Sequence, residues 1–289
     1  MEERVTFSSG SLALAGVIHF PPGHRPGDRH PAFLVLHGFG SNKSSSNCVL
    51  PARLLADWGY AALRFDFRGC GESGGGPGRV LCLEQVEDTK AAVSFMATRP
   101  EIDPARIAVV GSSFGAAVAV YAGGVDERIA AVISSGGWGD GETKFRRQHA
   151  GPGAWDKFTR MMDDGKRARA QGRQIMVPRY DIVPIPPQLR TNLAQQSVME
   201  FPFDTVDSMY NFQANTVVGK IAPRPLLLLH SSNDSVTPTE QSVGLFQHAG
   251  QPADLHLFAE TDHFMFSEDN PRVIAVIRAW LDRYLPERR

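Results

Sequence analysis

The sequence has little cysteine and no clustering of metal-binding residues. Its 289 residues include three cysteines, Cys48, Cys70 and Cys82, which cannot all pair with one another and show no Cys-x-x-Cys spacing. We therefore expect free thiols, and a disulfide-bonded scaffold is excluded. The nine histidines are scattered, without a His-x-x-x-His pair or clustered carboxylates, so the sequence predicts no metal site.

A large charge excess and long hydrophobic runs are also missing. Thirty Lys and Arg against 31 Asp and Glu give a net charge of −1, which argues against a nucleic-acid partner. No run approaches the roughly 18 apolar residues that a membrane span needs. Residues 1–7 lack the basic and apolar pattern of a signal peptide. We therefore expect a cytoplasmic protein without a membrane partner. The glycine-rich residues 71–78 lack the Lys and Ser/Thr ending of a phosphate-binding loop, so no cofactor is expected.

What the sequence does contain is a regular alternation of short apolar segments with helical ones. Such alternation predicts an α/β fold in which a mostly parallel sheet is covered by helices on both faces. Ligands then bind beyond the carboxyl ends of the strands. The expected strands cover residues 5–7, 12–20, 32–36, 61–65, 107–110, 129–134, 225–230 and 255–258, and the main helical segments are residues 49–58, 83–98, 114–123 and 271–284.

The pentapeptide Gly111-Ser112-Ser113-Phe114-Gly115 stands between an expected strand and an alanine-rich expected helix. A serine at such a turn has its hydroxyl held in the open, and the flanking glycines allow close backbone packing. Ser113 is therefore the candidate nucleophile. A serine hydroxyl needs a base to accept its proton, and that base needs a group that orients it.

Both partners have candidates further along the chain. Asp234 follows the buried strand over residues 225–230, and His263 follows the last strand. Asp262 competes for the role of acid. Because adjacent side chains usually diverge and Asp234 alone follows an apolar strand, we favour Asp234 as the acid and His263 as the base.

These motifs resemble those of serine hydrolases of the α/β-hydrolase superfamily, over about residues 12–285. His37-Gly-Phe-Gly40 and the segment 66–73 (DFRGCGES) are similar to bacterial carboxylesterases and cinnamoyl or feruloyl esterases. The segment 106–115 (RIAVVGSSFG) is similar to the prolyl-oligopeptidase and X-Pro-peptidase-like branch. Many of those esterases carry His before the nucleophile where this chain has Ser112, so the role of that His is not carried over.

The resemblance implies an oxyanion hole made of backbone N–H groups. Phe39, in the loop after the strand over residues 32–36, would supply one donor, and Phe114, directly after the nucleophile, the other. We expect His37 to hold this loop by hydrogen bonds. Asp66 and Arg68 are interpreted as a structural ion pair or a loop brace.

The resemblance also implies an eight-stranded sheet with a cap insertion after the sixth strand. Residues 1–137 and 221–289 would form the catalytic core and residues 138–220 the cap or lid. The insertion's apolar side chains could line a lid or build a small core of their own. Between residues 144 and 190 there are eleven Lys or Arg against four Asp or Glu, which indicates a solvated face or a surface that steers anions. The proline-rich residues 177–187 are expected to be extended, lying over the site or reaching a partner. The large apolar side chains are Trp138, Trp155, Phe158, Met161, Met162 and Met176.

The leading hypothesis is a serine hydrolase that cleaves carboxylic esters of small molecules through an acyl-enzyme. A peptidase or amidase and an acyltransferase with the same triad are alternatives, as is a receptor that uses the pocket without catalysis. A homodimer is left open.

Overall fold

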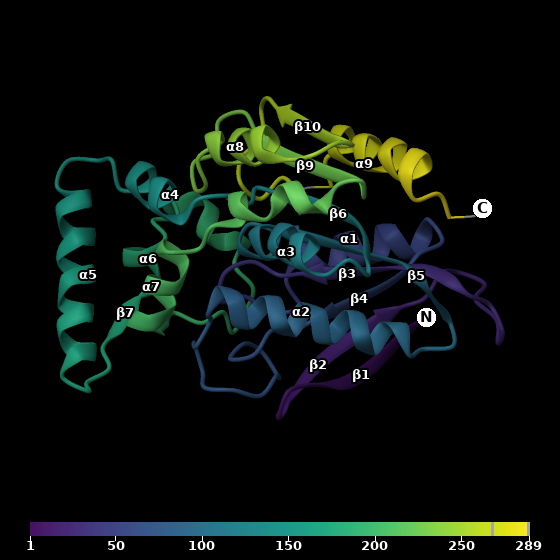
Figure 1. Ribbon diagram of the computed structural model, residues 1–289, viewed down its shortest axis with the longest axis horizontal. Coiled ribbons are helices and arrows are strands. Elements are labelled where there is room, and N and C mark those ends of the chain that lie inside the picture. The colour runs from purple at the N-terminus through teal and green to yellow at the C-terminus, as the bar shows by residue number, and fades with distance from the viewer. Residues whose placement is uncertain (267–268, 288–289) are drawn as a thin grey trace.

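The structure is a computed structural model that describes residues 1–266 and 269–287. Its centre is an eight-stranded sheet with the strand order β1-β2-β4-β3-β5-β6-β9-β10 (Figure 1). This sheet confirms the α/β fold expected from the alternation of segments. The strands are β1 (Glu2–Ser9), β2 (Leu12–His19), β3 (His30–Leu36), β4 (Ala61–Phe65), β5 (Ile102–Ser112), β6 (Ile129–Ser135), β9 (Leu226–Ser231) and β10 (Ala253–Phe258).

Strand direction brings the loops that carry the candidate site residues to one edge of the sheet. β2 is antiparallel to both of its neighbours, β1 and β4, whereas all the pairs from β4 to β10 are parallel. Leu36 at the end of β3 pairs with Gly111 in β5, and Ser112 pairs with Ser135 in β6. The loops after β3, β5 and β6 therefore leave the sheet side by side.

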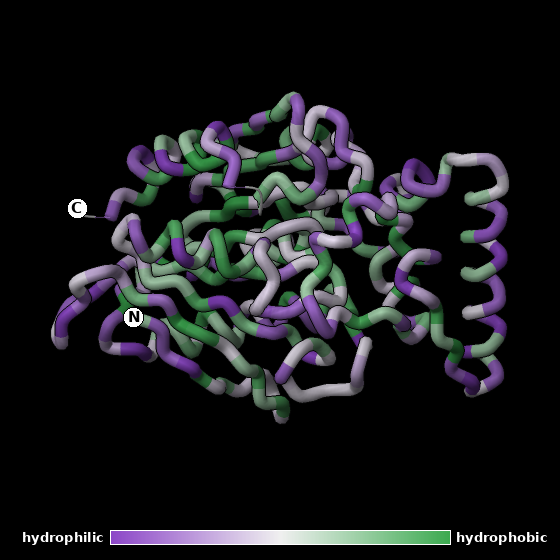
Figure 2. The backbone as a smooth tube through the Cα atoms, turned by 180° about the vertical axis from the view of Figure 1, so that it is seen from behind, coloured by the Kyte–Doolittle hydropathy of each residue, from purple (hydrophilic) through white to green (hydrophobic). Residues whose placement is uncertain are grey.

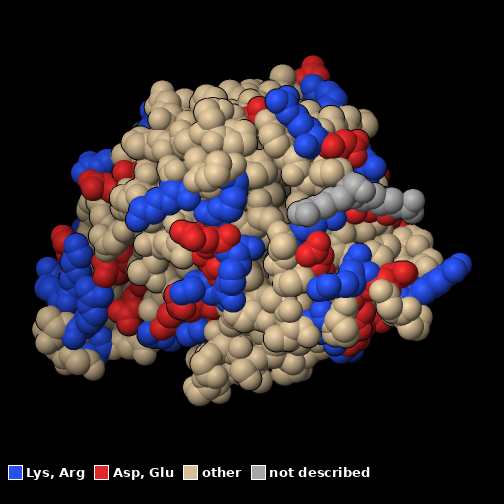
Figure 3. Space-filling view, turned by 45° about the vertical axis from the view of Figure 1, so that its right-hand side comes forward, with Lys and Arg blue, Asp and Glu red and all other residues tan. Residues whose placement is uncertain are grey.

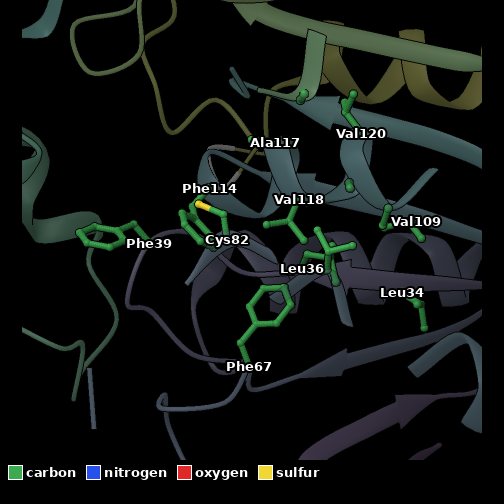
Figure 4. Close-up of a cluster of buried hydrophobic side chains, with 14 of the residues drawn as sticks. Leu34, Leu36, Phe39, Phe67, Cys82, Val109, Phe114, Ala117, Val118 and Val120 are labelled. Carbon is green, nitrogen blue, oxygen red and sulfur yellow. The ribbon is translucent and has the colours of Figure 1, made fainter. Parts of the chain in front are cut away.

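Helices cover both faces of the sheet. Phe33 and Val35 of β3 pack in the cluster that includes residues of α1 (Ser46–Asp57) and α9 (Pro271–Tyr284). Leu34 and Leu36 point the other way, into the cluster with α2 (Cys82–Ala97) and α3 (Phe114–Val125) (Figure 4). Because both faces are buried, the central strands are continuous apolar runs. A further helix, α8 (Glu240–His248), lies between β9 and β10 in the chain.

The segment between β6 and β9 contributes no strand to the main sheet. Most of its elements gather at one end of the molecule, with α5 outermost (Figure 1), and α5 is rich in hydrophilic residues (Figure 2). β7 and β8 form a separate antiparallel pair. The elements are α4 (Gly141–Gln148), α5 (Ala154–Ala170), β7 (Met176–Pro178), α6 (Arg179–Ile182), β8 (Glu200–Pro202), α7 (Phe203–Tyr210) and the 3₁₀ turns η1 (Pro187–Asn192), η2 (Ala214–Thr216) and η3 (Val218–Ile221).

The aromatic residues of this segment pack mainly against each other. The ring of Phe158 stacks on Phe145 at 5.0 Å and on Trp155 at 5.5 Å between centroids. Met176 is exposed. Of the six large apolar residues expected in the insertion, Trp138 lines the pocket described below, Phe158 and Met162 are buried in the main core cluster, and Trp155 and Met161 pack against that cluster.

The expectation that residues 177–187 are extended was wrong for residues 179–182, which form the helical turn α6. Pro178 directly precedes this turn, where proline is tolerated because no intrahelical donor is needed there. The three cysteines are free, as expected, and all three are buried. Within the described ranges no helix is both long and apolar enough to cross a membrane. On the face shown in Figure 3, positive and negative side chains are intermingled.

Candidate active site

Ser113 occupies a sharp turn between β5 and α3. Its backbone φ of 56° and ψ of −116° lie in a region that non-glycine residues rarely adopt. Its N–H donates to the carbonyl oxygen of Ser135 at 2.8 Å. The turn also needs the glycines, since a Cβ on Gly115 would lie 2.5 Å from the carbonyl oxygen of Leu36. The local backbone thus presents the Ser113 side chain at the edge of the sheet.

His263 joins Ser113 to Asp234. The Nε2 atom of His263 lies 2.8 Å from Ser113 Oγ, and its Nδ1 lies 2.8 Å from Asp234 Oδ2 and 3.1 Å from Oδ1. The carboxylate accepts from Nδ1–H, which leaves Nε2 to accept from the serine hydroxyl. The three residues predicted from strand ends far apart in the chain are therefore brought together in one hydrogen-bonded series.

The Asp234 carboxylate is fully buried and well supplied with donors. Its Oδ1 accepts from the backbone N–H groups of Val236 at 2.8 Å and Thr237 at 2.7 Å. Burial by itself would raise the pKa of Asp234. The charge and hydrogen bonds of His263 and His230 outweigh it and hold that pKa well below its ordinary value. Asp234 is thus ionised whenever His263 accepts a proton.

His230 is a second histidine at the same carboxylate, and the sequence analysis did not assign it. Its Nε2 lies 3.2 Å from Asp234 Oδ2 and 3.0 Å from the carbonyl oxygen of Thr237. Since both neighbours are acceptors, Nε2 carries the proton. Nδ1 lies 2.6 Å from Ser242 Oγ, which fixes the ring. His230 therefore anchors the acid together with His263, since both rings lie within ion-pair distance of the same carboxylate oxygen, Oδ2.

Asp262 makes a different set of bonds. Its carboxylate accepts from the N–H of Ser235 at 2.9 Å, from the Ser235 hydroxyl at 2.8 Å and from the backbone N–H of His263 at 2.7 Å. These bonds tie the loop after β10 to the loop after β9. The His263 ring therefore bonds Asp234 and not Asp262.

The loop after β3 lies directly beside the serine. A Cβ on Gly38 would be 3.7 Å from Ser113 Cβ, and the rings of Phe39 and Phe114 are 5.9 Å apart. His37 accepts from the N–H of Phe67 at 3.1 Å through Nε2 and bonds the Gly38 carbonyl at 2.8 Å through Nδ1, as expected of a residue that holds this loop. Among the described residues no acceptor is found for the N–H of Phe39 or Phe114, so both donors remain available for a ligand oxygen.

The predicted ion pair between Asp66 and Arg68 does not form, because each has another partner. The buried Asp66 pairs with Lys43 Nζ and accepts from the N–H groups of Lys43 and Glu72. Arg68 pairs with the buried Asp88 at 2.6 Å. Asp66 and Arg68 each brace a loop, which is the second of the two alternatives expected from the sequence.

A small pocket opens at Ser113, with a cavity volume of about 40 Å³. Phe39, Ser113 and His263 form one side, and residues of the segment between β6 and β9 form much of the other. Among residues 1–266 and 269–287, no Asp or Glu lines it. The residues contributed by that segment are Trp138, Lys144, Arg179, Val183, Ile185, Asn192, Leu193 and Met209.

Two of the pocket residues are buried cations that the sequence analysis did not single out. Arg179 donates to the carbonyl oxygens of Phe39 and, at 2.7 Å, Val198, and burial lowers its pKa to about 10. Lys144 donates to Gln148 Oε1 at 2.9 Å. Burial lowers the pKa of Lys144 to about 7. Neither has a carboxylate within ion-pair distance among residues 1–266 and 269–287.

One group outside this site could offer metal ligands, namely His24, Asp28 and His30 between β2 and β3. His24 Nδ1 and His30 Nε2 lie 2.9 Å apart and share a hydrogen bond. That bond uses two of the nitrogen atoms a metal ion would need. The group contains none of the residues around Ser113.

Comparison with known proteins agrees with the fold. A model of the alpha/beta hydrolase family matches residues 33–276. The uncharacterized protein PA2218 of Pseudomonas aeruginosa is 29% identical over 253 residues, which are 78% of this chain and 66% of that protein. The polyketide transferase grgF of a Penicillium species is 25% identical over 254 residues, 81% of each chain.

Two solved structures share the fold. The crystal structure of the alpha/beta hydrolase GrgF from Penicillium superposes with a TM-score of 0.79 at 22% identity, covering 98% of this chain and 99% of that one. Est1E from Butyrivibrio proteoclasticus, solved with ferulic acid bound, gives a TM-score of 0.71 at 16% identity and covers 97% of this chain and 98% of that one.

Proposed function

Because the chain belongs to the alpha/beta hydrolase family, we propose that it is a serine hydrolase that cleaves carboxylic esters of small molecules through an acyl-enzyme. The observation that carries the proposal is the pair of 2.8 Å hydrogen bonds by which His263 joins Ser113 to Asp234. This is the geometry in which a weakly nucleophilic hydroxyl gains a base that a carboxylate orients.

In the first half of the reaction, Ser113 Oγ attacks the carbonyl carbon of the ester while His263 Nε2 takes the hydroxyl proton. The negative charge that develops on the carbonyl oxygen is stabilised by the N–H groups of Phe39 and Phe114. Asp234 stabilises the resulting imidazolium. His263 then gives the proton to the leaving alcohol as the bond to it breaks.

In the second half, His263 takes a proton from a water molecule, which attacks the acyl carbon. The same two N–H groups stabilise the second tetrahedral intermediate, and the proton returns to Ser113 as the carboxylic acid leaves. The chemistry of each half needs only atoms of the protein, the ester and water.

The segment of residues 138–220 acts in this proposal as a cap that covers the serine and shapes the acyl pocket. Val183 and Ile185 lie in the pocket wall together with Trp138. Arg179 joins the cap to the Phe39 carbonyl. Closing a site against water in this way strengthens the electrostatic effect of the oxyanion donors.

Acyl transfer is the second candidate. It is favoured by the similarity to a protein named as a polyketide transferase, grgF, at 25% identity over 81% of the chain. The acyl-enzyme is the same in both reactions. Only the acceptor differs, since an alcohol, amine or thiol would replace the water in the second half.

Labelling with a fluorophosphonate probe tests the activated serine. We expect the wild-type protein to be labelled and Ser113→Ala to remain unlabelled. Ser112→Ala is a matched control, because Ser112 is the adjacent residue but is buried in β5. A Ser113→Ala protein that is still labelled, or an unlabelled wild-type protein, would reject the proposal.

The two reactions are separated by their products. The enzyme is given an ester together with an alcohol or thiol acceptor, and the free acid and the transferred acyl product are quantified. Hydrolysis predicts free acid as the main product at every acceptor concentration. A transferase predicts that the acyl-acceptor product dominates once the acceptor is present.

A further inference from the structure

Lys144 is fully buried in the wall of the candidate active site. Its side chain starts on α4, is 1% exposed and lines the same pocket as Ser113 and His263. The ammonium group can donate three hydrogen bonds, and one is used, to Gln148 Oε1 at 2.9 Å. Among the described residues, the remaining donors have no partner that would compensate the charge.

The aromatic rings around Lys144 do not replace such a partner. Nζ lies 4.6 Å from the ring centroid of Trp138 and 4.0 Å from that of Phe145. Cation–π contacts are favourable, but they return only part of what is lost when an ammonium group leaves water. Burial accordingly lowers the pKa of Lys144 to about 7, with Cys82 and Asp234 acting in the opposite direction.

Lys43 is a second buried lysine of this protein, and its role is structural. Its side chain is 7% exposed, and Nζ pairs with both Asp66 and Glu72. In contrast, the described residues hold no carboxylate within ion-pair distance of Lys144, and Asp234 is occupied by His263 and His230. A lysine without a counterion is thus placed at a ligand pocket rather than in the core.

The pocket contains two further buried donors without acceptors. Trp138 Nε1 and Arg179 Nε have no hydrogen-bond partner in the part of the chain that the structure describes, although both side chains are at least 98% buried. Both residues line the pocket with Lys144. Buried polar atoms are normally satisfied. Three such donors around one pocket whose described lining holds no carboxylate favour a ligand that brings acceptor oxygens.

We infer that the substrate carries a carboxylate in addition to the ester, and that Lys144 is the residue that selects it. This inference rests on the proposed function and narrows its substrate class to half-esters or to esters of hydroxy acids. The substrate carboxylate supplies the counterion that Lys144 lacks. A charge-assisted hydrogen bond formed in a dry pocket is stronger than a neutral one, so the pair would discriminate against uncharged esters.

Matched pairs of charged and neutral esters test the inference. Monoethyl succinate and monoethyl glutarate place the carboxylate on the acyl side, with ethyl butyrate and ethyl pentanoate as neutral partners. Acetoxyacetate places it on the alcohol side, with propyl acetate as its partner. The ratio of kcat/KM for charged over neutral ester is measured with a pH-stat for the wild type, for Lys144→Met and for Lys166→Met.

For the wild type we expect a charged-over-neutral kcat/KM ratio of about 10 to 100 either for the esters with an acyl-side carboxylate or for those with an alcohol-side carboxylate. The series that shows this ratio identifies the side of the ester on which the substrate carboxylate lies. Lys144→Met should lower that ratio by a similar factor. Lys166→Met, a change of the same kind at an exposed position of α5, should leave it unaltered. A wild type that prefers the neutral ester in every arm, or a Lys144→Met protein that keeps the ratio, would overturn the inference.

A binding measurement separates this inference from the proposed function. Glutarate should raise the melting temperature of Ser113→Ala and should not raise that of Ser113→Ala/Lys144→Met. Binding of glutarate without hydrolysis of any ester by the wild type would reject the esterase and keep the carboxylate site. Hydrolysis of neutral esters that depends on Ser113, with no effect of glutarate on either variant, would reject the carboxylate site and keep the esterase.

Discussion

Arg179 donates a hydrogen bond from Nη2 to the carbonyl oxygen of Phe39. The contact joins the first turn after β7 to the loop after β3, across 140 residues of sequence. Its guanidinium also lies 5.3 Å from the Phe39 ring centroid. Since the Phe39 N–H is one of the proposed oxyanion donors, this bond ties the proposed cap to the proposed oxyanion loop.

Arg179→Met should therefore impair catalysis. The change removes the donor to the Phe39 carbonyl, and a loop displaced by a fraction of an ångström aims its N–H poorly. We expect kcat to fall by roughly 10- to 100-fold with a smaller change in KM, measured on a neutral ester. Arg160→Met, at an exposed position of α5, is the control. An unchanged kcat together with a lower melting temperature would show that Arg179 has only a structural role.

Asp234→Asn should lower kcat far more than Asp262→Asn. Asparagine at position 234 cannot stabilise the imidazolium of His263, so kcat should fall by about 10⁴. Asp262 bonds Ser235 and a backbone N–H, so its substitution should cost less than about tenfold. Steady-state hydrolysis of the same ester by both variants is the measurement. A larger loss for Asp262→Asn would reassign the acid.

Much of the fold and of the candidate site could be predicted because the relevant signals are local. Strands buried on both faces are continuous apolar runs, and the polar residues that follow them, such as Asp234, lie at the carboxyl edge of the sheet. The start of β5 was missed by five residues. Asp103, Pro104 and Ala105 at its beginning are at least partly exposed and lack the apolar pattern, and pairing with β3 is irregular there.

The cationic part of the pocket could not be predicted from local signals. Lys144 stands shortly before Arg146 and Arg147, both of which are well exposed, and nothing in the local sequence distinguishes it from them. Its burial results from packing of α4 against α7 and the core. His230 was similarly hidden, because as the penultimate residue of an apolar strand it is typical of a buried strand end.

Lys43→Met should destabilise the protein strongly. Asp66 is fully buried, and loss of the Lys43 ammonium leaves its charge without its main partner. Breaking a buried pair from one side costs about 3–5 kcal/mol of unfolding free energy. Urea denaturation measures it. Lys90→Met breaks a more exposed pair with Glu87 and should change that free energy by less than about 1 kcal/mol. A loss of similar size in both variants would mean that water reaches Asp66.

In contrast to Lys43→Met, Lys144→Met should stabilise the protein at neutral and acidic pH. Replacing a buried cation that has no counterion by an apolar side chain of similar length should raise the free energy of unfolding by about 1–4 kcal/mol at pH 6. The variant would then be more stable than the wild type but less selective for its substrate. The reason is that the buried ammonium destabilises the free folded protein, and its charge is compensated only when the substrate carboxylate binds.

The advantage of Lys144→Met should shrink as the pH rises. The pKa of Lys144 is about 7 in the folded protein and 10.5 as the ordinary value. Between these limits the unfolded wild type binds one proton more than the folded one, so its unfolding free energy rises with pH relative to the variant. Below pH 7 both states are protonated and the difference is constant. Urea denaturation of both proteins at pH 6, 8 and 9.5 measures the gap. A gap that stays constant or widens toward pH 9.5 would show that Lys144 is as well solvated in the fold as in the unfolded chain.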